Sequence, residues 1–288
     1  MVGEARLPNT YSPELVEASE ADKEKSKAEY IVMLNAFRRL LLVAEDEEDM
    51  WDGIEFLAEL RADALIDRVH RGLNLSADEV RTRLIKATPF LTDREKEERD
   101  ILIAAYDNLV EFAVAQQYAM VCDLPEPDKD YLSEADIEEY EETFSKYNSV
   151  YASQENQDVF HAAGIAFWWL GVESSKIITY MTQRDERVRD THAILDGFYA
   201  PKHSFPPELI PPIEFGCRCY LTSDSNYIMA LSKPSFSRKP EVNPVFSESL
   251  ATKGRIFTDH HSYFKMPKKA KDRVKEISER IKKKYYGN

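Results

Sequence analysis

Hydrophobic residues recur at intervals of three and four along most of the first 170 positions, which is the spacing of amphipathic helices. Tyr30, Met33, Phe37 and Leu41 mark the first such face, in a segment that begins near Glu20. The pattern predicts a helical bundle over residues 20–171, with a loose arm over 1–19. We expect His70 and His161, each alone on a predicted helix, to be structural.

Polar signals divide this region into separate helices. Ser76 and Thr92 are each followed three residues later by a glutamate, which is the capping-box pattern of a helix start. Ser133 precedes a strongly acidic segment in the same way, and we expect Ser153 to begin one more helix. The prolines within 124–128 predict a break before the acidic helix.

After Gly171 the pattern changes to short β-branched and aromatic runs. Residues 176–181 and 219–222 read as strands, and a polar helical turn ends at Asp196-Gly197. We therefore predict a mainly α fold in which residues 172–224 form a small α+β region. A proline-rich linker over 225–264, with Pro234, Pro240 and Pro244, then leads to a basic C-terminal helix over 265–288.

Charge is unevenly distributed along the chain. The 288 residues carry a formal net charge of −14, and 43% of them are hydrophobic, enough for a sizeable core. A protein that coats DNA with its whole surface is excluded, because phosphate binding needs positive charge. Residues 265–288 carry +7, which predicts contact with DNA or an acidic partner, or else a solvated helix. The candidate contacts are Lys268, Lys269, Lys271, Arg273, Lys275, Arg280, Lys282, Lys283 and Lys284.

Three cysteines are too few for the disulfide framework of a small secreted protein. The N-terminus has no apolar segment typical of a signal peptide, and no apolar run approaches the ~20 residues of a membrane span. We expect a protein made in a reducing cytoplasm, with no membrane partner.

A metal site is the main chemical candidate. Cys217 and Cys219 offer two thiolates, His192 and His203 offer imidazoles, and Asp185 or Glu214 could supply an oxygen. The spacing matches no standard zinc finger. The alternative is a packed loop in which Arg189 and Arg218 bind acidic partners and the thiols are buried. A cysteine–histidine nucleophile lacks a supporting signature, and no glycine-rich phosphate loop is present.

The segment 182–219 resembles the MuF-type phage head morphogenesis domain, the family that includes protein F of phage Mu. The resemblance rests on Thr182-x-x-Asp185-Glu-Arg-Val-Arg189, His192-x-x-Leu-Asp-Gly197, a proline-rich gap and Cys-Arg-Cys219. Its motif positions are Thr182, Asp185, Arg187, Arg189, Leu195, Asp196, Gly197, Pro212 and Arg218. Family members often have cysteines at the positions of Arg189 and His192 and a histidine at that of Glu214. This chain lacks those three ligands, so the resemblance leaves His192, Cys217 and Cys219 as the remaining potential zinc ligands. The alternative is that the loop keeps its fold without an ion, with an Arg189–carboxylate pair in place of the metal.

The resemblance also implies a function. It predicts a non-enzymatic, low-copy head protein that associates with the portal and other head proteins and affects DNA packaging or ejection. Such a protein is found in the host cytoplasm during assembly and then in the virion head or neck; oligomerisation is left open. One alternative is a MuF-linked toxin or effector enzyme, for which the ~65 residues after 222 are short. The other is a nucleic-acid-binding module that acts through the basic tail.

Overall fold

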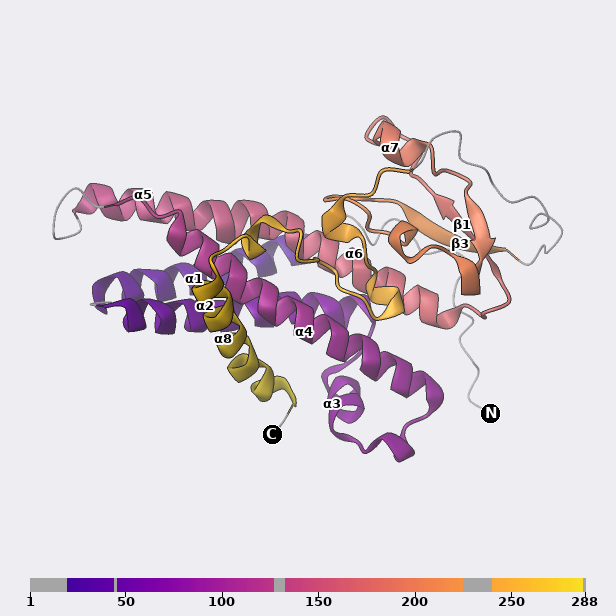
Figure 1. Cartoon of the computed structure of the whole chain (residues 1–288), viewed down its shortest axis with the longest axis horizontal. Coiled ribbons are helices and arrows are strands. Elements are labelled where there is room, and N and C mark those ends of the chain that lie inside the picture. Colours follow the sequence, from indigo (N-terminus) through magenta and orange to yellow (C-terminus); the bar gives the residue numbers. More distant parts are fainter. Residues whose placement is uncertain (1–19, 44–45, 127–132, 225–239, 287–288) are drawn as a thin grey trace. The chain divides into compact units, whose positions relative to one another are not determined.

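The computed structural model describes residues 20–43, 46–126, 133–224 and 240–286, so the predicted N-terminal arm and Pro234 lie outside the described residues. The fold is mainly α with one small antiparallel sheet, as the sequence predicts (Figure 1). The long helices are α1 (Glu20–Val43), α2 (Glu47–Gly72), α4 (Asp93–Cys122), α6 (Ala152–Gly171) and α8 (Lys268–Tyr286), and the shorter ones are α3 (Ala77–Ile85), α5 (Glu134–Ser145) and α7 (Asp190–Ala193). Within the described ranges, no helix is both long and apolar enough to cross a membrane.

The sheet has the strand order β2-β1-β3, with β1 (Ile177–Met181) in the centre. β1 pairs antiparallel with β3 (Tyr220–Asp224) over its whole length and with β2 (Tyr199–Pro201) over three residues. Ile178 and Leu221, on the two predicted strands, are fully buried. Of the three strands, β2 alone was not predicted from the sequence, because three residues that include a proline carry no detectable strand pattern.

The chain divides into two compact units. One contains residues 68–105 and 157–258, and the other contains 18–67, 106–156 and 259–288. Helices α2, α4 and α6 each contribute residues to both units, so the predicted bundle over 20–171 supplies helices to both. The sheet and the family-like motif belong entirely to the first unit, whereas α8 belongs to the second.

The predicted capping boxes at Ser76, Thr92 and Ser133 are present, with reciprocal bonds to Glu79, Glu95 and Asp136. The helix expected to start at Ser153 and end at Gly171 is present as α6, but Ser153 does not cap it. The chain instead passes from α5 through a π-helical turn, Lys146–Tyr151, directly into α6, so Ser153 lies inside a helix. Buried partners stabilise this turn, because Gln116 donates to the Tyr147 carbonyl and Gln117 bonds the Asn148 side chain. Such π-turns occur mostly as single insertions in α-helices.

A buried ion pair crosses the core of the second unit. The Arg61 guanidinium donates to Glu155 at 2.7 Å, and both side chains are at most 4% exposed. Arg61 also donates to Gln116 and Asn156, and the Tyr263 hydroxyl donates to the other oxygen of Glu155. Burial raises the pKa of Glu155, while Arg61 opposes that shift. Every polar atom of the pair thus has a partner, as a buried charge requires.

The segment after the sheet is packed. The described residues of the predicted linker, 240–264, form short 3-10 turns with apolar side chains that are almost fully buried, among them Phe246, Leu250 and Phe257. In the first unit Phe246 contacts Phe215 edge-on with ring centres 4.9 Å apart, and Phe257 with ring centres 5.7 Å apart. These rings support the loop that leads to the two neighbouring cysteines.

Candidate metal centre

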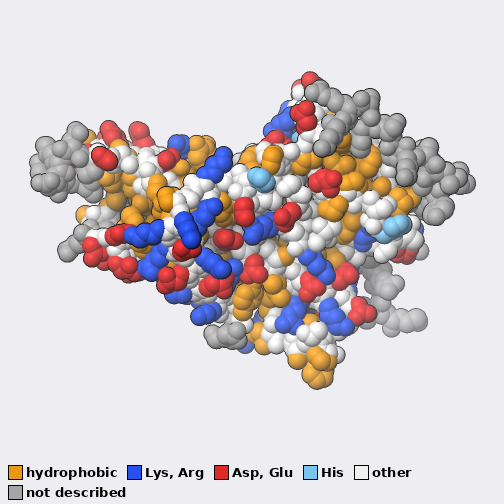
Figure 2. All heavy atoms as spheres, in the orientation of Figure 1, with side chains coloured by type: hydrophobic (Ala, Val, Ile, Leu, Met, Phe, Trp, Pro, Cys, Tyr) orange, Lys and Arg blue, Asp and Glu red, His pale blue; other side chains and the backbone are white. Residues whose placement is uncertain are grey.

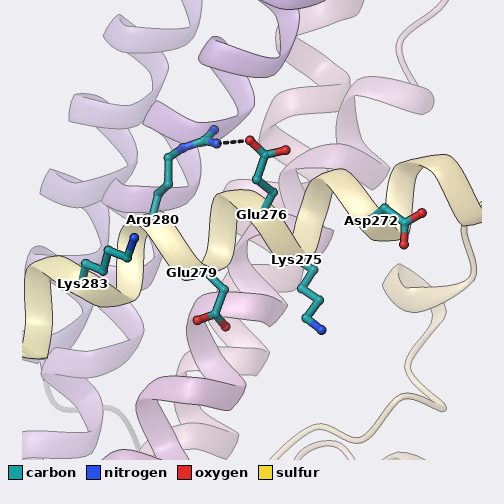
Figure 3. A pocket seen from close by; sticks show the side chains of 6 residues that line it. All are labelled: Asp272, Lys275, Glu276, Glu279, Arg280 and Lys283. Atoms are coloured by element: carbon teal, nitrogen blue, oxygen red, sulfur yellow. Dashed lines mark hydrogen bonds and ion pairs between the residues drawn. The ribbon is translucent and has the colours of Figure 1, made fainter.

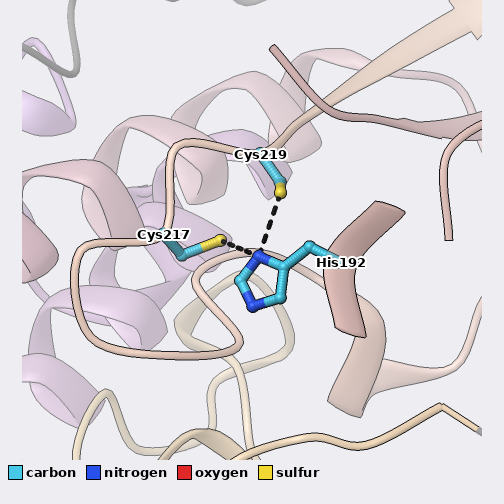
Figure 4. A group of neighbouring side chains, drawn as sticks. All are labelled: His192, Cys217 and Cys219. Carbon is cyan, nitrogen blue, oxygen red and sulfur yellow. Dashed lines mark hydrogen bonds between the residues drawn. The ribbon is translucent and has the colours of Figure 1, made fainter. Parts of the chain in front are cut away.

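His192, Cys217 and Cys219 come together in the first unit, although 27 residues separate the first from the last (Figure 4). Helix α7 carries His192, and the loop before β3 carries both cysteines. The Nδ1 atom of His192 lies 3.4 Å from the Cys219 Sγ and 3.9 Å from the Cys217 Sγ. All three side chains are buried, and their ligand atoms lie within 4.8 Å of one another. This group could hold a metal ion.

These distances fit zinc. Zinc binds thiolate sulfur at about 2.3 Å and imidazole nitrogen at about 2.0 Å in a tetrahedral arrangement, which places a ligand nitrogen and sulfur about 3.5 Å apart. The two observed nitrogen–sulfur distances lie on either side of this value. Soft thiolates with an imidazole are also the donor set that favours zinc over magnesium or calcium. The residues present therefore fit the ion that the sequence resemblance implies.

The surroundings of the two thiols shift their pKa values in opposite directions. Burial disfavours a charge on Cys217, but hydrogen bonds from Cys219, His161 and His192 outweigh burial and hold its pKa well below the ordinary range. The hydrogen bond with Cys217, together with burial, raises the pKa of Cys219. Burial, with both thiols nearby, also raises the pKa of Tyr180 well above its ordinary value. These shifts favour loss of the first proton from Cys217, and a bound dication would favour loss of the second.

Helix α6 positions the cysteine loop. Asp158 accepts a 2.8 Å hydrogen bond from the Gly216 amide, and the Nε2 atom of His161 lies 2.9 Å from the Cys219 carbonyl oxygen. Both α6 side chains are 1% exposed. Gly216 has a φ of +67°, a conformation that glycine adopts without strain. The place of His161 beside the cysteines was not predicted, because a lone histidine on a helix carries no signal of its partner.

The family-like motif positions form one hydrogen-bonded knuckle, defined here as residues 182–219. Asp185 accepts two bonds from the Arg218 guanidinium, at 2.7 and 2.8 Å. Asp196 accepts from the Thr182 amide and hydroxyl and from Arg184. Gly197 has a φ of +83°, and its amide donates a hydrogen bond to the Tyr180 carbonyl. Leu195 is fully buried. The Pro211-Pro212 peptide bond is cis.

The other predicted ligands do not join the metal group. The carboxylate of Asp185 is taken by Arg218, and Glu214 accepts from the Phe215 amide and the Asn243 side chain. His203 is exposed in a 3-10 turn. Arg189 donates to the Phe215 carbonyl at 2.8 Å, so among the described residues it binds a backbone oxygen and not an acidic side chain. Of the two pairings in the alternative interpretation, only that of Arg218 with a carboxylate is confirmed.

The basic helix α8 has acidic partners within its own unit. Five of its cationic side chains pair with carboxylates of α2 or α4: Lys269 with Glu47, Arg273 with Glu48, Arg280 with Glu55, Lys284 with Glu59 and Lys282 with Asp107. On the opposite face Lys268, Lys271, Lys275 and Lys283 are exposed. Figure 3 shows Lys275 and Lys283 beside Asp272 and Glu279, with Glu276 bonded to Arg280. In Figure 2 red and blue side chains are interspersed around α8, so this surface is mixed in charge.

Comparison with known proteins yields little. No protein-family model matches the chain, and no solved structure matches it. An uncharacterized protein of Methanocaldococcus jannaschii is 44% identical over 57 residues, which cover 19% of this chain and 8% of that protein. The chain therefore spans less than a tenth of that relative's length, and the likeness is confined to one short segment.

Proposed function

We propose that the chain is a low-copy, non-enzymatic head protein of a tailed phage, of the MuF type, that acts at the portal during head assembly and in DNA packaging or ejection. The observation that carries this proposal is the knuckle. Asp185 with Arg218, Thr182 with Asp196, and His192 with the two cysteines are separate parts of the motif, and all make side-chain contacts within it. A chance match of short motifs has no reason to produce such mutual contacts.

We propose zinc as the ion of the knuckle. A structural zinc site stabilises a small segment that lacks a large core of its own. The knuckle has few regular elements, since α7 is four residues long and the neighbouring β2 only three. Zinc on His192, Cys217 and Cys219 would tie α7 to the strand that enters the sheet at Tyr220. In this role the metal holds a binding surface in place and performs no reaction.

The test of the head-protein role is the composition of the particle. Virions of the phage that encodes the chain would be purified and digested, and the chain would be counted with isotope-labelled peptides. We expect far fewer copies than of the major head protein. Absence from the particle, or an abundance equal to that of the major head protein, would contradict the role.

Matched variants connect this role to the knuckle. Arg218→Ala removes both hydrogen bonds to Asp185, and we expect it to reduce incorporation into heads and co-purification with the portal. The control is Lys253→Ala, which removes an ion pair with Asp100 in the same unit but outside the knuckle. Equal incorporation of the two variants would show that the knuckle is not the docking element.

A second candidate function is nucleic-acid binding through α8, favoured by the four exposed lysines on its outer face. Each phosphate contact contributes about −0.9 to the slope of log affinity against log salt, so four contacts predict a slope near −4 at most. Replacement of Lys268, Lys271, Lys275 and Lys283 by glutamine should then abolish binding to DNA. Binding that survives this replacement, or that is insensitive to salt, would exclude α8 as the site.

A further inference from the structure

A structural zinc ion takes four ligands, and the metal group supplies three of them. The three cysteines and six histidines of the chain all lie among the described residues, so the undescribed segments contain neither residue type. Within the first unit the further histidines are His70, His161 and His203. His203 is exposed, whereas His161 is buried and contacts the Cys217 thiol. His161 is therefore the candidate for the fourth ligand.

The hydrogen bond of the His161 ring fixes the position of its proton. The Nε2 atom lies 2.9 Å from the Cys219 carbonyl oxygen. A carbonyl oxygen can only accept, so Nε2 carries a proton, and in the neutral ring the lone pair is then on Nδ1. Metal-binding histidines have this tautomer when their second nitrogen donates to a backbone carbonyl. In this chain the carbonyl belongs to Cys219, itself a member of the metal group.

The Cys217 thiol contacts two imidazole rings. Its Sγ atom is 3.9 Å from Nδ1 of His192, and it also contacts the ring of His161. The nitrogens of His161 lie outside the group of atoms that are all within 4.8 Å of one another. Coordination therefore requires the His161 ring or the Cys217 side chain to rotate inward. Zinc bonds of about 2.0–2.3 Å would draw these donors together.

Charge favours an imidazole over a carboxylate as the fourth ligand. Asp158 is one turn before His161 on α6 and is also buried, and its Oδ1 atom accepts the Gly216 amide. Zinc with two thiolates and two neutral imidazoles has no net charge. A carboxylate in place of the second imidazole would leave one uncompensated negative charge in the core, which is costly.

We propose that His161 is the fourth ligand of the zinc, through Nδ1, and that it closes a tetrahedral site with His192, Cys217 and Cys219. This inference rests on the zinc site of the proposed function and adds a ligand from a long helix. The ion would then join three segments, namely α6, α7 and the loop before β3. Four protein ligands make a closed zinc site, which is the structural kind.

The first readout is the number of imidazoles on the zinc of the full chain, counted by X-ray absorption at the zinc edge. We expect two sulfurs and two imidazoles. The second readout is zinc affinity, measured by competition with a chelator. His161→Gln keeps an N–H donor for the Cys219 carbonyl but removes Nδ1. It should leave one imidazole and weaken zinc binding by more than about 100-fold, beyond the ~10–100-fold loss typical of residues that only hydrogen-bond a ligand.

The control is His203→Gln, at an exposed histidine of the same unit, which should leave both readouts unchanged. Zinc with one imidazole and an oxygen ligand in the wild-type chain would overturn the role of His161 while the metal site stands. Two imidazoles retained in His161→Gln would overturn it as well. If no zinc binds, the metal site is refuted together with the role of His161, and the head-protein role is still decided by the virion count.

Discussion

Replacement of Glu155 by glutamine should strongly destabilise the unit that contains residues 18–67, 106–156 and 259–288. The substitution keeps the shape of the side chain and removes its charge. Oε2 of Glu155 accepts hydrogen bonds from Arg61 and Gln116, and Oε1 accepts one from Tyr263. A glutamine amide presents one nitrogen to these donors, so at least one donor loses its acceptor, and the Arg61 charge is left uncompensated at 2% exposure.

The expected cost follows from this burial. Removal of one partner from a buried ion pair costs about 3–5 kcal/mol, because the remaining charge stays in a low-dielectric core. The matched control is Glu141→Gln, which breaks the pair with Arg38, where the side chains are 25% and 51% exposed. Exposed pairs of this kind contribute about 0–1 kcal/mol. The two variants should therefore differ by at least about 2 kcal/mol in the free energy of unfolding.

The assay is urea unfolding at pH 8. A Trp168→Phe/Trp169→Phe background leaves Trp51 as the fluorescent reporter, and Trp51 lies in the same unit as Glu155. Arg61→Met added to Glu155→Gln should recover part of the loss, because it removes the stranded charge. A cost below about 1 kcal/mol for Glu155→Gln, or one equal to that of Glu141→Gln, would refute the reasoning.

Three further predictions concern other parts of the chain. Burial lowers the pKa of His261 from 6.5 to about 4. Between these two pH values the unfolded state binds a proton and the folded state does not, so the free energy of unfolding falls by about 3 kcal/mol as the pH drops from above 6.5 to below 4. His261→Gln should remove this part of the pH dependence in urea unfolding. Gly72→Ala should cost about 1–3 kcal/mol in urea unfolding, since its Cβ would lie 2.5 Å from that of Ala163; no change would show that α2 and α6 can separate there. Arg280→Glu should increase hydrogen exchange in α8, and Glu55→Arg in the same chain should restore protection; failure to restore it would refute the pairing.

The sequence predicts the helices and caps well, because these depend on local pattern. Capping boxes at Ser76, Thr92 and Ser133 require only residues three positions apart, and all three are present. The π-helical turn at 146–151 was not predictable in this way. It depends on Gln116 and Gln117, which are about thirty residues distant and reach it only through tertiary packing.

The partners of charged residues were also beyond the sequence prediction. The tail was expected to contact DNA or an acidic partner, and its closest acidic partner proves to be α2 of the same chain. One signal was present: Glu48, Glu55 and Glu59 repeat at intervals of seven and four, and so do their partners on α8, Arg273, Arg280 and Lys284. For the metal group, the sequence predicts His192, Cys217 and Cys219 as candidate ligands. It could not show that Asp185 and Glu214 are engaged by Arg218 and Asn243, because those contacts depend on tertiary packing.

The most direct test of the account is the metal content of the full chain purified without chelator. The account predicts about one zinc per chain. It also predicts that Cys217→Ser/Cys219→Ser loses the zinc and unfolds at a lower temperature, while Cys122→Ser, at an exposed cysteine, keeps both properties. Absence of zinc from the wild-type chain, together with an unchanged melting temperature in the double variant, would contradict the metal-held knuckle.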